Sequence, residues 1–239
     1  MVLPILLLTW PGLWREQGEP RVRAYVFDAY GTLFDVHAAV RRHAEIIGAS
    51  SGTLSELWRQ KQLEYTWIRA LAGRYRDFAA LTEESLEYAL ATVAPQHMHL
   101  KARLLAAYRS LDAYPDVAGA LTSLKATGAT IAILSNGTRE MLDAAVASAA
   151  LGRLIDAIYS VDVLHTYKTD PRVYAWAARE LGLQPGEISF QSSNRWDIAG
   201  AAAAGLRPVW INRGNRRDEY ADLLPVAVLT SLAGLSALP

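Results

Sequence analysis

Short apolar runs, each ended by a turn, alternate with amphipathic segments through the second half of the chain. Strand-length apolar runs occur at 129–134, 157–161, 187–191, 207–211 and 226–229. Helical spacing fills the intervals at 117–127, 138–149, 171–181 and 196–204, and a short helix is expected to close the chain. Strands that alternate with helices in this way predict a parallel sheet with right-handed crossovers.

One further strand precedes this series. The apolar run from Ala24 to Phe27 is short, partly β-branched and aromatic, and is followed by Asp28 and a turn that contains Gly31. Ligands of open α/β sheets bind outside the carboxyl ends of the strands, so Asp28 is expected to face a crevice. A carboxylate in that place can be a nucleophile, a metal ligand or a buried structural acid, and this segment alone does not separate the three.

The chain between the first strand and the alternating series has a helical pattern. Four segments carry helix-like spacing, at 37–47, 54–72, 82–94 and 98–110. Thr82-Glu83-Glu84 resembles a helix start, and Tyr114-Pro115-Asp116 ends the block. The expected fold is α/β, with a Rossmann-like core of residues 22–36 and 113–239, an inserted all-helical cap of residues 37–112 and an N-terminal extension of residues 1–21. The cleft between cap and core is the expected ligand site.

Composition narrows the classes of function. The 239 residues are 51% hydrophobic and 20% charged, as in globular proteins. Lys+Arg and Asp+Glu both number 24, which leaves no basic surplus for nucleic-acid binding. The lack of cysteine excludes disulfides, thiolate zinc sites and cysteine nucleophiles, and fits a cytoplasmic protein. The apolar start MVLPILLLTW is far shorter than the ~20 residues of a membrane span, and it lacks the features of a signal peptide.

Four polar clusters fall just after predicted strands. They are Asp28-Ala29-Tyr30-Gly31-Thr32, Ser135-Asn136-Gly137, Lys168 after Tyr167, and Ser192-Ser193-Asn194-Arg195-Trp196-Asp197. Each is an ordinary loop on its own, but the carboxyl ends of parallel strands meet at one edge of a sheet, where ligands bind. Together the clusters predict a catalytic site. The five histidines form no credible metal-binding set: His37, His43, His97, His99 and His165.

These clusters carry a family resemblance. FDAYGTLFDV, LSNG, YK followed by DPRVY, and SSNRWD resemble the four motifs of the haloacid dehalogenase superfamily, in the form typical of type II L-2-haloacid dehalogenases, or (S)-2-haloacid dehalogenases. WRQKQLEYTW at 58–67 resembles the cap segment of that subgroup, and the resemblance covers about residues 22–235. It departs at Thr169, which follows Lys168 where the family usually has proline. A different turn there would weaken substrate binding.

The departures from the phosphatases of the same superfamily all favour dehalogenation. Those enzymes use a second aspartate, two residues after the nucleophile, as a general acid. Here that position is Tyr30, and a phenol with an ordinary pKa of ~10 is a poor substitute. Their fourth motif has two acids five residues apart to hold Mg²⁺, whereas here the pair is Ser192 and Asp197. Mg²⁺ requires charged oxygen ligands, so no metal and no other cofactor is expected. A halide leaving group needs no proton.

The resemblance implies a two-step hydrolysis of a small 2-haloalkanoic acid. Asp28 attacks C2 of an L-2-haloacid from behind the halogen, halide leaves and an ester forms. Water then attacks the carbonyl carbon of Asp28 and releases a D-2-hydroxy acid. Arg59 and Asn136, with Phe78 as an apolar wall, would receive the halide. Ser135 and Lys168 would hold the substrate carboxylate.

The remaining roles also come from the resemblance. Lys168 would keep Asp28 ionised, because a nearby cation favours the charged form of an acid. Thr32 and Ser192 would orient Asp28 by hydrogen bonds. Asp197 would activate the hydrolytic water, with Asn194 positioning it. The residues expected to shape the pocket are Tyr30, Gln60, Leu63, Tyr174 and Trp196.

Simpler interpretations exist for several of these residues. Arg59 could form a surface ion pair with Glu56 on the same helix. Asn194 could cap the helix that begins near Arg195. Four residues could serve packing alone: Leu63, Phe78, Tyr174 and Trp196.

Two other functions stay open at this point. A Mg²⁺-dependent phosphatase acting on a small phosphate ester is disfavoured by Tyr30 and Ser192. A catalytically idle binding protein of the same fold is expected to lack the nucleophile or the halide arginine, and neither Asp28 nor Arg59 is missing. A homodimer is expected from the family, and neither a membrane nor a nucleic-acid partner is expected.

Overall fold

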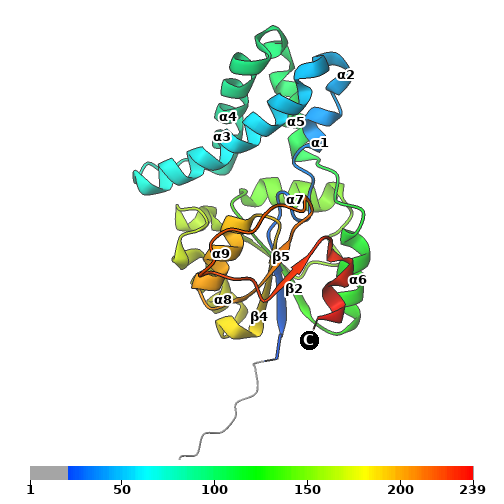
Figure 1. The fold of residues 1–239 in the computed structure, drawn as a ribbon, viewed down its shortest axis with the longest axis vertical. Coiled ribbons are helices and arrows are strands. Elements are labelled where there is room, and N and C mark those ends of the chain that lie inside the picture. The colour runs from blue at the N-terminus through cyan, green and yellow to red at the C-terminus, as the bar shows by residue number, and fades with distance from the viewer. Residues whose placement is uncertain (1–20, 239) are drawn as a thin grey trace, which may run out of the picture.

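A single parallel sheet forms the centre of the computed structural model, which describes residues 21–238 (Figure 1). Its strands are β1 Ala24–Phe27, β2 Thr130–Ser135, β3 Ala157–Ser160, β4 Ile188–Ser192, β5 Arg207–Ile211 and β6 Ala227–Leu229. They lie in the order β3-β2-β1-β4-β5-β6, and every neighbouring pair is parallel. The predicted α/β fold with a parallel sheet is confirmed, and β1 occupies an inner position where apolar side chains are buried on both faces.

Helices cover both faces of this sheet. They are α6 Val117–Ala126, α7 Arg139–Ser148, α8 Pro171–Leu181 and α9 Arg195–Ala203, with the 3₁₀ segments η3 Val161–Leu164, η4 Pro185–Glu187 and η5 Leu232–Ala237. Figure 1 shows α8 and α9 on one side of the sheet, and α6 packed with η5 on the other. Local signals fix the ends of α8, since Asp170 caps it, Pro171 begins it and Gly182 ends it with a φ of 65°. The expected C-terminal helix is a 3₁₀ segment.

A helical layer stands over the carboxyl ends of the strands (Figure 1). Its elements are α1 Ala38–Arg41, α2 Ala44–Ile47, η1 Gly48–Ser50, α3 Ser51–Leu71, α4 Phe78–Val93, η2 Pro95–Leu100 and α5 Lys101–Arg109. The long helix α3 packs along α4. Two antiparallel linkers join this layer to the sheet. They are held together by two hydrogen bonds, from the N–H of Asp35 to the carbonyl of Asp112 at 2.9 Å and from the N–H of Tyr114 to the carbonyl of Leu33 at 3.0 Å. The exact domain boundaries stay a prediction.

Three helix boundaries in this layer differ from those predicted. The segment 37–47 is broken into two short helices, with His43 outside helical geometry at φ −117° and ψ 12°. Helix α4 begins at Phe78 and not at Thr82, because the side chain of Asp77 accepts the N–H of Ala80 and caps it earlier. The first turn of the segment 98–110 is 3₁₀, and the α-helix begins at Lys101.

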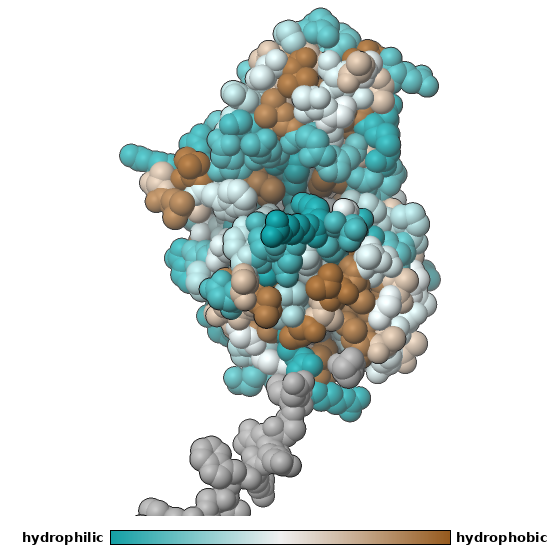
Figure 2. Space-filling model, in the orientation of Figure 1, coloured by the Kyte–Doolittle hydropathy of each residue, from teal (hydrophilic) through white to brown (hydrophobic). Residues whose placement is uncertain are grey.

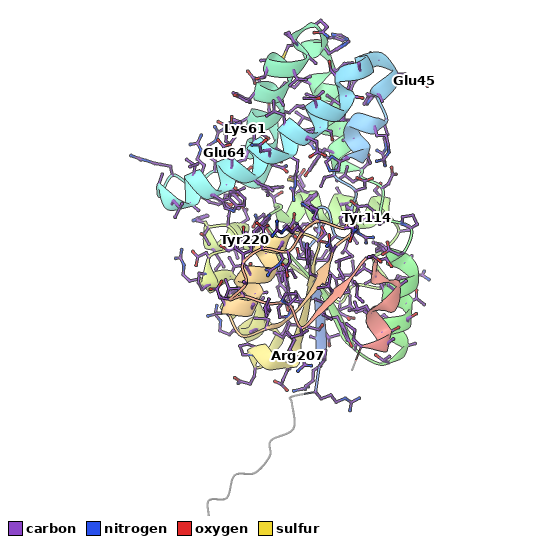
Figure 3. The ribbon with its side chains drawn as sticks, viewed as in Figure 1. Glu45, Lys61, Glu64, Tyr114, Arg207 and Tyr220 are labelled. Atoms are coloured by element: carbon purple, nitrogen blue, oxygen red, sulfur yellow. The ribbon has the colours of Figure 1, made fainter. Side chains whose placement is uncertain are left out.

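The predicted N-terminal extension lies outside the described residues, apart from Arg21. Within residues 21–238, no helix combines the length and hydropathy needed to cross a membrane. Figure 3 shows that Tyr114 and Tyr220 lie on the side of the sheet that faces the helical layer, whereas Arg207 lies at the opposite edge. The sheet edge under the helical layer is therefore the one at which the carboxyl ends of the strands converge.

Candidate active site

Asp28 lies directly beyond β1, and its backbone N–H continues the ladder to β4. Its carboxylate is buried and its two oxygens have different surroundings. Oδ2 accepts from Thr32 Oγ1 at 3.0 Å, from Asn194 Nδ2 at 2.8 Å and from Ser192 Oγ at 3.4 Å. Within residues 21–238, Oδ1 accepts only from Lys168 Nζ, at 3.1 Å. The carboxylate is thus held firmly through one oxygen, and the other is left with free lone pairs.

A second buried acid shares the same lysine. Lys168 Nζ lies 2.8 Å from Asp197 Oδ2, and the other oxygen of Asp197 accepts from the hydroxyl of Tyr174 at 2.7 Å. Burial by itself would lower the pKa of Lys168, but the carboxylates of Asp197 and Asp28 outweigh burial and raise it. Burial raises the pKa of Asp197 to about 6, against the opposing effects of Lys168 and Tyr174. Asp197 is thus the acid of the cluster that gains a proton near neutral pH.

The residues of this edge do not fit the magnesium centre known from phosphatases of this fold. An ammonium group, Lys168 Nζ, bridges the carboxylates of Asp28 and Asp197, so a cation already lies between the two acids. The position that would supply a third carboxylate is Ser192, a neutral and weaker ligand for Mg²⁺. Within residues 21–238, no group of three His, Cys, Asp or Glu side chains could hold a metal ion.

The loop after β2 lies beside the nucleophile loop. Asn136 Oδ1 accepts the backbone N–H of Lys168 at 3.0 Å, and its Nδ2 group remains available as a donor. Ser135 Oγ accepts the N–H of Gly137 at 3.2 Å. A Cβ on Gly137 would come within 2.7 Å of the Tyr30 ring, so only glycine allows this close approach. The second and third polar clusters therefore converge on the first, as the strand pattern predicted.

Arg59 reaches the site from α3. Its Nη1 donates to Gln62 Oε1 at 2.8 Å, and its Nη2 donates to the carbonyl of Tyr30 at 3.2 Å. The same carbonyl lies 3.3 Å from Asn194 Nδ2, which also holds Asp28. The simpler interpretation of an Arg59–Glu56 pair is wrong, because Glu56 lies 3.8 Å from the ring of His37 instead. The guanidinium of Arg59 is therefore linked to the carboxylate of Asp28 through the carbonyl of Tyr30 and the side-chain amide of Asn194.

Aromatic rings surround this contact. The ring centroid of Tyr30 lies 5.4 Å from that of Tyr108 and 5.6 Å from that of Phe78. Burial raises the pKa of Tyr30 well above its ordinary value, and its hydroxyl has no hydrogen-bond partner among the described residues. The raised pKa keeps the phenol of Tyr30 neutral beside Asp28 and Arg59. Phe78, 1% exposed, is part of the same group of rings.

A cavity of about 670 Å³ opens between the helical layer and the sheet. Arg59, Leu63, Asn194 and Trp196 line it, and Trp196 meets Trp67 of α3 edge to face at 5.6 Å. Four further arginines lie around it: Arg195, Arg213, Arg216 and Arg217. Figure 2 shows hydrophilic residues in the band where the two layers meet. Two glutamates, Glu56 and Glu219, also line it, so the five arginines leave a basic surplus, and the volume is large enough for a small organic anion. Asp28 and Lys168 are not among the residues that line this cavity.

Three predicted site residues are placed differently from what was expected. Gln60 is exposed on α3 and does not line this cavity. Tyr174 is fully buried on α8, where it bonds Asp197 from behind and shapes no pocket wall. Asn194 precedes α9 without capping it by its side chain, which is engaged by Asp28. Lys168 reaches both carboxylates with Thr169 following it, and the effect of Thr169 on substrate binding stays a prediction.

Sequence reasoning missed three residues that support the site. Gln62 and Tyr108 are buried polar side chains next to Arg59 and Tyr30. Ser193 bonds the nucleophile loop twice, through its N–H to Thr32 Oγ1 at 2.8 Å and through its hydroxyl to the carbonyl of Gly31 at 2.6 Å. Gln62 could have been found from its spacing, since residues three apart share a helix face.

Comparison with known proteins places this site in a family. Residues 22–205 match the family of haloacid dehalogenase-like hydrolases. The (S)-2-haloacid dehalogenase 1 of Pseudomonas sp. (strain CBS-3) is 50% identical over 218 residues, which cover 91% of this chain and 96% of that protein. The corresponding enzyme of Xanthobacter autotrophicus is 44% identical, over 90% of this chain and 85% of that protein.

Solved structures agree with the sequence comparison. The crystal structure of a dehalogenase has a TM-score of 0.88 at 48% identity, and covers 91% of this chain and 97% of that one. The L-2-haloacid dehalogenase from Xanthobacter autotrophicus with chloropropionic acid covalently bound has a TM-score of 0.81 at 35% identity, over 91% of this chain and 98% of that one. The chain belongs to the (S)-2-haloacid dehalogenases, within the family of haloacid dehalogenase-like hydrolases.

Proposed function

We propose that this protein hydrolyses the carbon–halogen bond of short L-2-haloacids and yields a D-2-hydroxy acid and halide. One observation carries the proposal. The carbonyl of Tyr30 accepts from both Arg59 and Asn194, and Asn194 also holds Asp28, so the buried carboxylate and the guanidinium are linked through two shared groups. The covalent chloropropionic acid complex of a relative supports the formation of an ester in such a site.

In the first step, Oδ1 of Asp28 attacks C2 of the substrate. This oxygen accepts only one hydrogen bond, from Lys168, so it keeps the lone pair that forms the new C–O bond. The carbon–halogen bond breaks, and the halide departs with the bonding electrons toward Arg59, Asn136 and Phe78. Attack opposite the leaving group inverts C2. Ser135, Lys168 and backbone N–H groups of the first loop would hold the substrate carboxylate.

In the second step, water attacks the carbonyl carbon of the Asp28 ester. Oδ2 is then the carbonyl oxygen, and its three donors, Thr32, Asn194 and Ser192, are already in place to stabilise the oxyanion that develops there. Asp197 is the candidate for accepting the proton of this water. The bond from the carbonyl carbon to Oδ1 breaks and the leaving oxygen takes the proton held by Asp197. The hydroxy acid departs with its configuration at C2 retained, and Asp28 keeps the oxygen of the water and releases the second proton to solvent.

A metal-dependent phosphatase is the weaker candidate. Lys168 already lies between the two acids, and Tyr30 has a buried phenol with a raised pKa where a phosphatase needs an acid. We therefore expect activity without added metal.

The test is halide release from the two enantiomers of 2-chloropropionate in the presence of EDTA. We expect release from the L enantiomer only, and none from Asp28→Asn. A single turnover in ¹⁸O-water should label Asp28 before the product. Release of phosphate from an aryl phosphate with Mg²⁺, and no halide from L-2-chloropropionate, would favour the phosphatase.

Three further expectations accompany the function. We propose a homodimer, supported by exposed apolar residues at the projecting end of α3, where Ile68 is 59% and Leu71 87% exposed (Figure 2). Light scattering on the purified protein tests it.

A cytoplasmic location fits the cysteine-free sequence. The helical layer of residues 37–112 would act as the cap that closes the substrate site.

A further inference from the structure

A chain of buried hydrogen bonds crosses the helical layer from α4 to α3. It begins at Thr82, whose Oγ1 lies 2.7 Å from the carbonyl of Phe78 one turn earlier. The carbonyl can only accept, so the single hydroxyl proton of Thr82 is given to Phe78. The same oxygen lies 2.7 Å from the side-chain amide of Gln62, and must accept there. The hydroxyl of Thr82 thus selects the NH₂ end of the Gln62 amide.

This polarity fixes the other end of the amide as well. Gln62 Oε1 faces Arg59 Nη1 at 2.8 Å, as an acceptor for a cationic donor. The hydroxyl of Tyr108 lies 3.2 Å from both ends of the amide and can join either. Gln62 is fully buried, so water does not compete for these bonds. The reverse orientation would place two donors against each other at Arg59.

The arrangement leaves part of the guanidinium free. Arg59 has five N–H donors, of which one goes to Gln62 and one to the carbonyl of Tyr30, and the hydroxyl of Tyr108 is a further hydrogen-bond partner of the guanidinium. These partners are neutral, so the positive charge is held in place without being cancelled. A group fixed in advance loses no side-chain entropy when charge develops on the leaving atom.

We propose that Gln62 is a positioning residue for halide departure, acting by holding Arg59 in the orientation that receives the halogen. This rests on the proposed dehalogenase function. Among the described residues, Gln62 forms side-chain hydrogen bonds with Arg59, Thr82 and Tyr108 and not with Asp28, so its effect should fall on the first chemical step alone. A poorer leaving group depends more on stabilisation of the departing halide. Loss of the Gln62 side chain should therefore slow chloride release more than bromide release.

The experiment measures halide release in a single turnover with L-2-bromo- and L-2-chloropropionate. Gln62→Met keeps the volume but removes both hydrogen-bonding ends. We expect the chloride rate to fall about 100-fold, as for a catalytic group displaced by about 1 Å, with a smaller fall for bromide and a KM within about twofold of wild type. A merely structural role would lower both rates equally.

Three variants of α4 extend and control the test. Thr82→Val removes the hydroxyl that orients Gln62 and should change the chloride-to-bromide ratio in the same direction, whereas Thr82→Ser should recover it. Ser85→Ala removes a hydroxyl that is also buried and bonded to a carbonyl one turn earlier, Leu81 at 2.7 Å, and that lies 3.1 Å from the backbone carbonyl of Thr82 but forms no hydrogen bond with Gln62. It should leave the ratio unchanged.

The outcomes separate the two proposals. An active wild type whose chloride-to-bromide ratio is unaltered in Gln62→Met and Thr82→Val would overturn the positioning role alone. If Gln62→Met does not fold, the ratio in Thr82→Val decides. A wild-type protein that releases halide from neither substrate would overturn the dehalogenase function itself.

Discussion

On the sheet side of the site, three charged groups meet in a space from which water is excluded, whereas the helical side offers one guanidinium among aromatic rings. Lys168 lies 3.1 Å from Asp28 and 2.8 Å from Asp197, and none of the three is more than 5% exposed. Arg59 is only partly buried, and its hydrogen-bond partners are an amide, a carbonyl and the hydroxyl of Tyr108. Charge is therefore compensated on one side and left available on the other.

The difference follows from when charge is needed. The nucleophile is charged before the reaction, so a counter-ion must be present in the resting protein, where an isolated buried carboxylate would be costly. The halide acquires charge only as the carbon–halogen bond breaks. A carboxylate beside Arg59 would cancel its charge in advance, whereas Gln62 and the carbonyl of Tyr30 orient it without doing so. The sheet side should thus matter for folding and for catalysis, and the helical side chiefly for catalysis.

The largest effect is expected from Lys168→Met. This change leaves Asp28 and Asp197 buried without their counter-ion, and loss of one partner of a buried pair costs about 3–5 kcal/mol of unfolding free energy. Halide release should fall by about 10³-fold, since the substrate carboxylate also loses its cation. Denaturant unfolding and the halide assay measure both. Lys125→Met, which breaks a surface pair with Asp156, is the control and should change little. An unfolding free energy of Lys168→Met equal to that of the wild type would contradict the conclusion that the sheet side contributes to folding as well as to catalysis.

A smaller effect, confined to activity, is expected from Arg59→Lys. An ammonium is a compact point charge and cannot donate to Gln62, to the carbonyl of Tyr30 and to a halide with the same fork geometry. We expect chloride release to fall about 10- to 100-fold, while stability changes by less than about 0.5 kcal/mol. Arg69→Lys, on the same helix and paired with Glu84 at 3.3 Å, is the matched control. Destabilisation as large as that of Lys168→Met would remove the distinction between the two sides.

The sheet side was largely predictable from the sequence. Apolar runs locate the strands, and polar residues at their carboxyl ends must share one edge of the sheet, so Asp28 and Ser135 could be brought together without coordinates. Lys168 is separated from β3 by η3, and its place in the site was predicted from the resemblance of YK followed by DPRVY. The role of Tyr174 could not be predicted in this way. It lies behind Asp197 because of how α8 packs against α9, which depends on contacts distant in sequence.

The helical side was predicted less well, for a physical reason. In a helix each residue is turned by about 100° from the next, so a shift of one or two residues in packing changes which side chain faces the site. Gln60 was expected in the pocket and is exposed, whereas Gln62, three residues after Arg59 and on its face of α3, is buried beside it. The spacing places Gln62 on the same face of α3 as Arg59, but only the packing of α3 on α4 determines that this face is the one turned to the site.

The smallest effect, and the most selective, is expected from Tyr174→Phe. Burial raises the pKa of Asp197 to about 6, and the hydrogen bond from Tyr174 opposes that rise. Without the hydroxyl the pKa of Asp197 should rise further, by up to about one pH unit, because a hydrogen bond to a charged group contributes roughly 1.5 kcal/mol. If ionised Asp197 accepts the proton of the hydrolytic water, the rate of ester hydrolysis falls as pH drops through this value.

The acid limb of ester hydrolysis should therefore move to higher pH in Tyr174→Phe, with the rate at high pH little changed. Single-turnover decay of the ester, measured from pH 5 to 9, tests this. Tyr159→Phe is the control, since that ring packs on Trp176 at 5.6 Å, away from the acids. An unmoved limb would exclude Asp197 as the base. The rate of halide release depends on Arg59 and should not change with the pKa of Asp197. If Tyr174→Phe moves the pH dependence of ester hydrolysis but not that of halide release, the sheet side and the helical side act on different steps of the reaction.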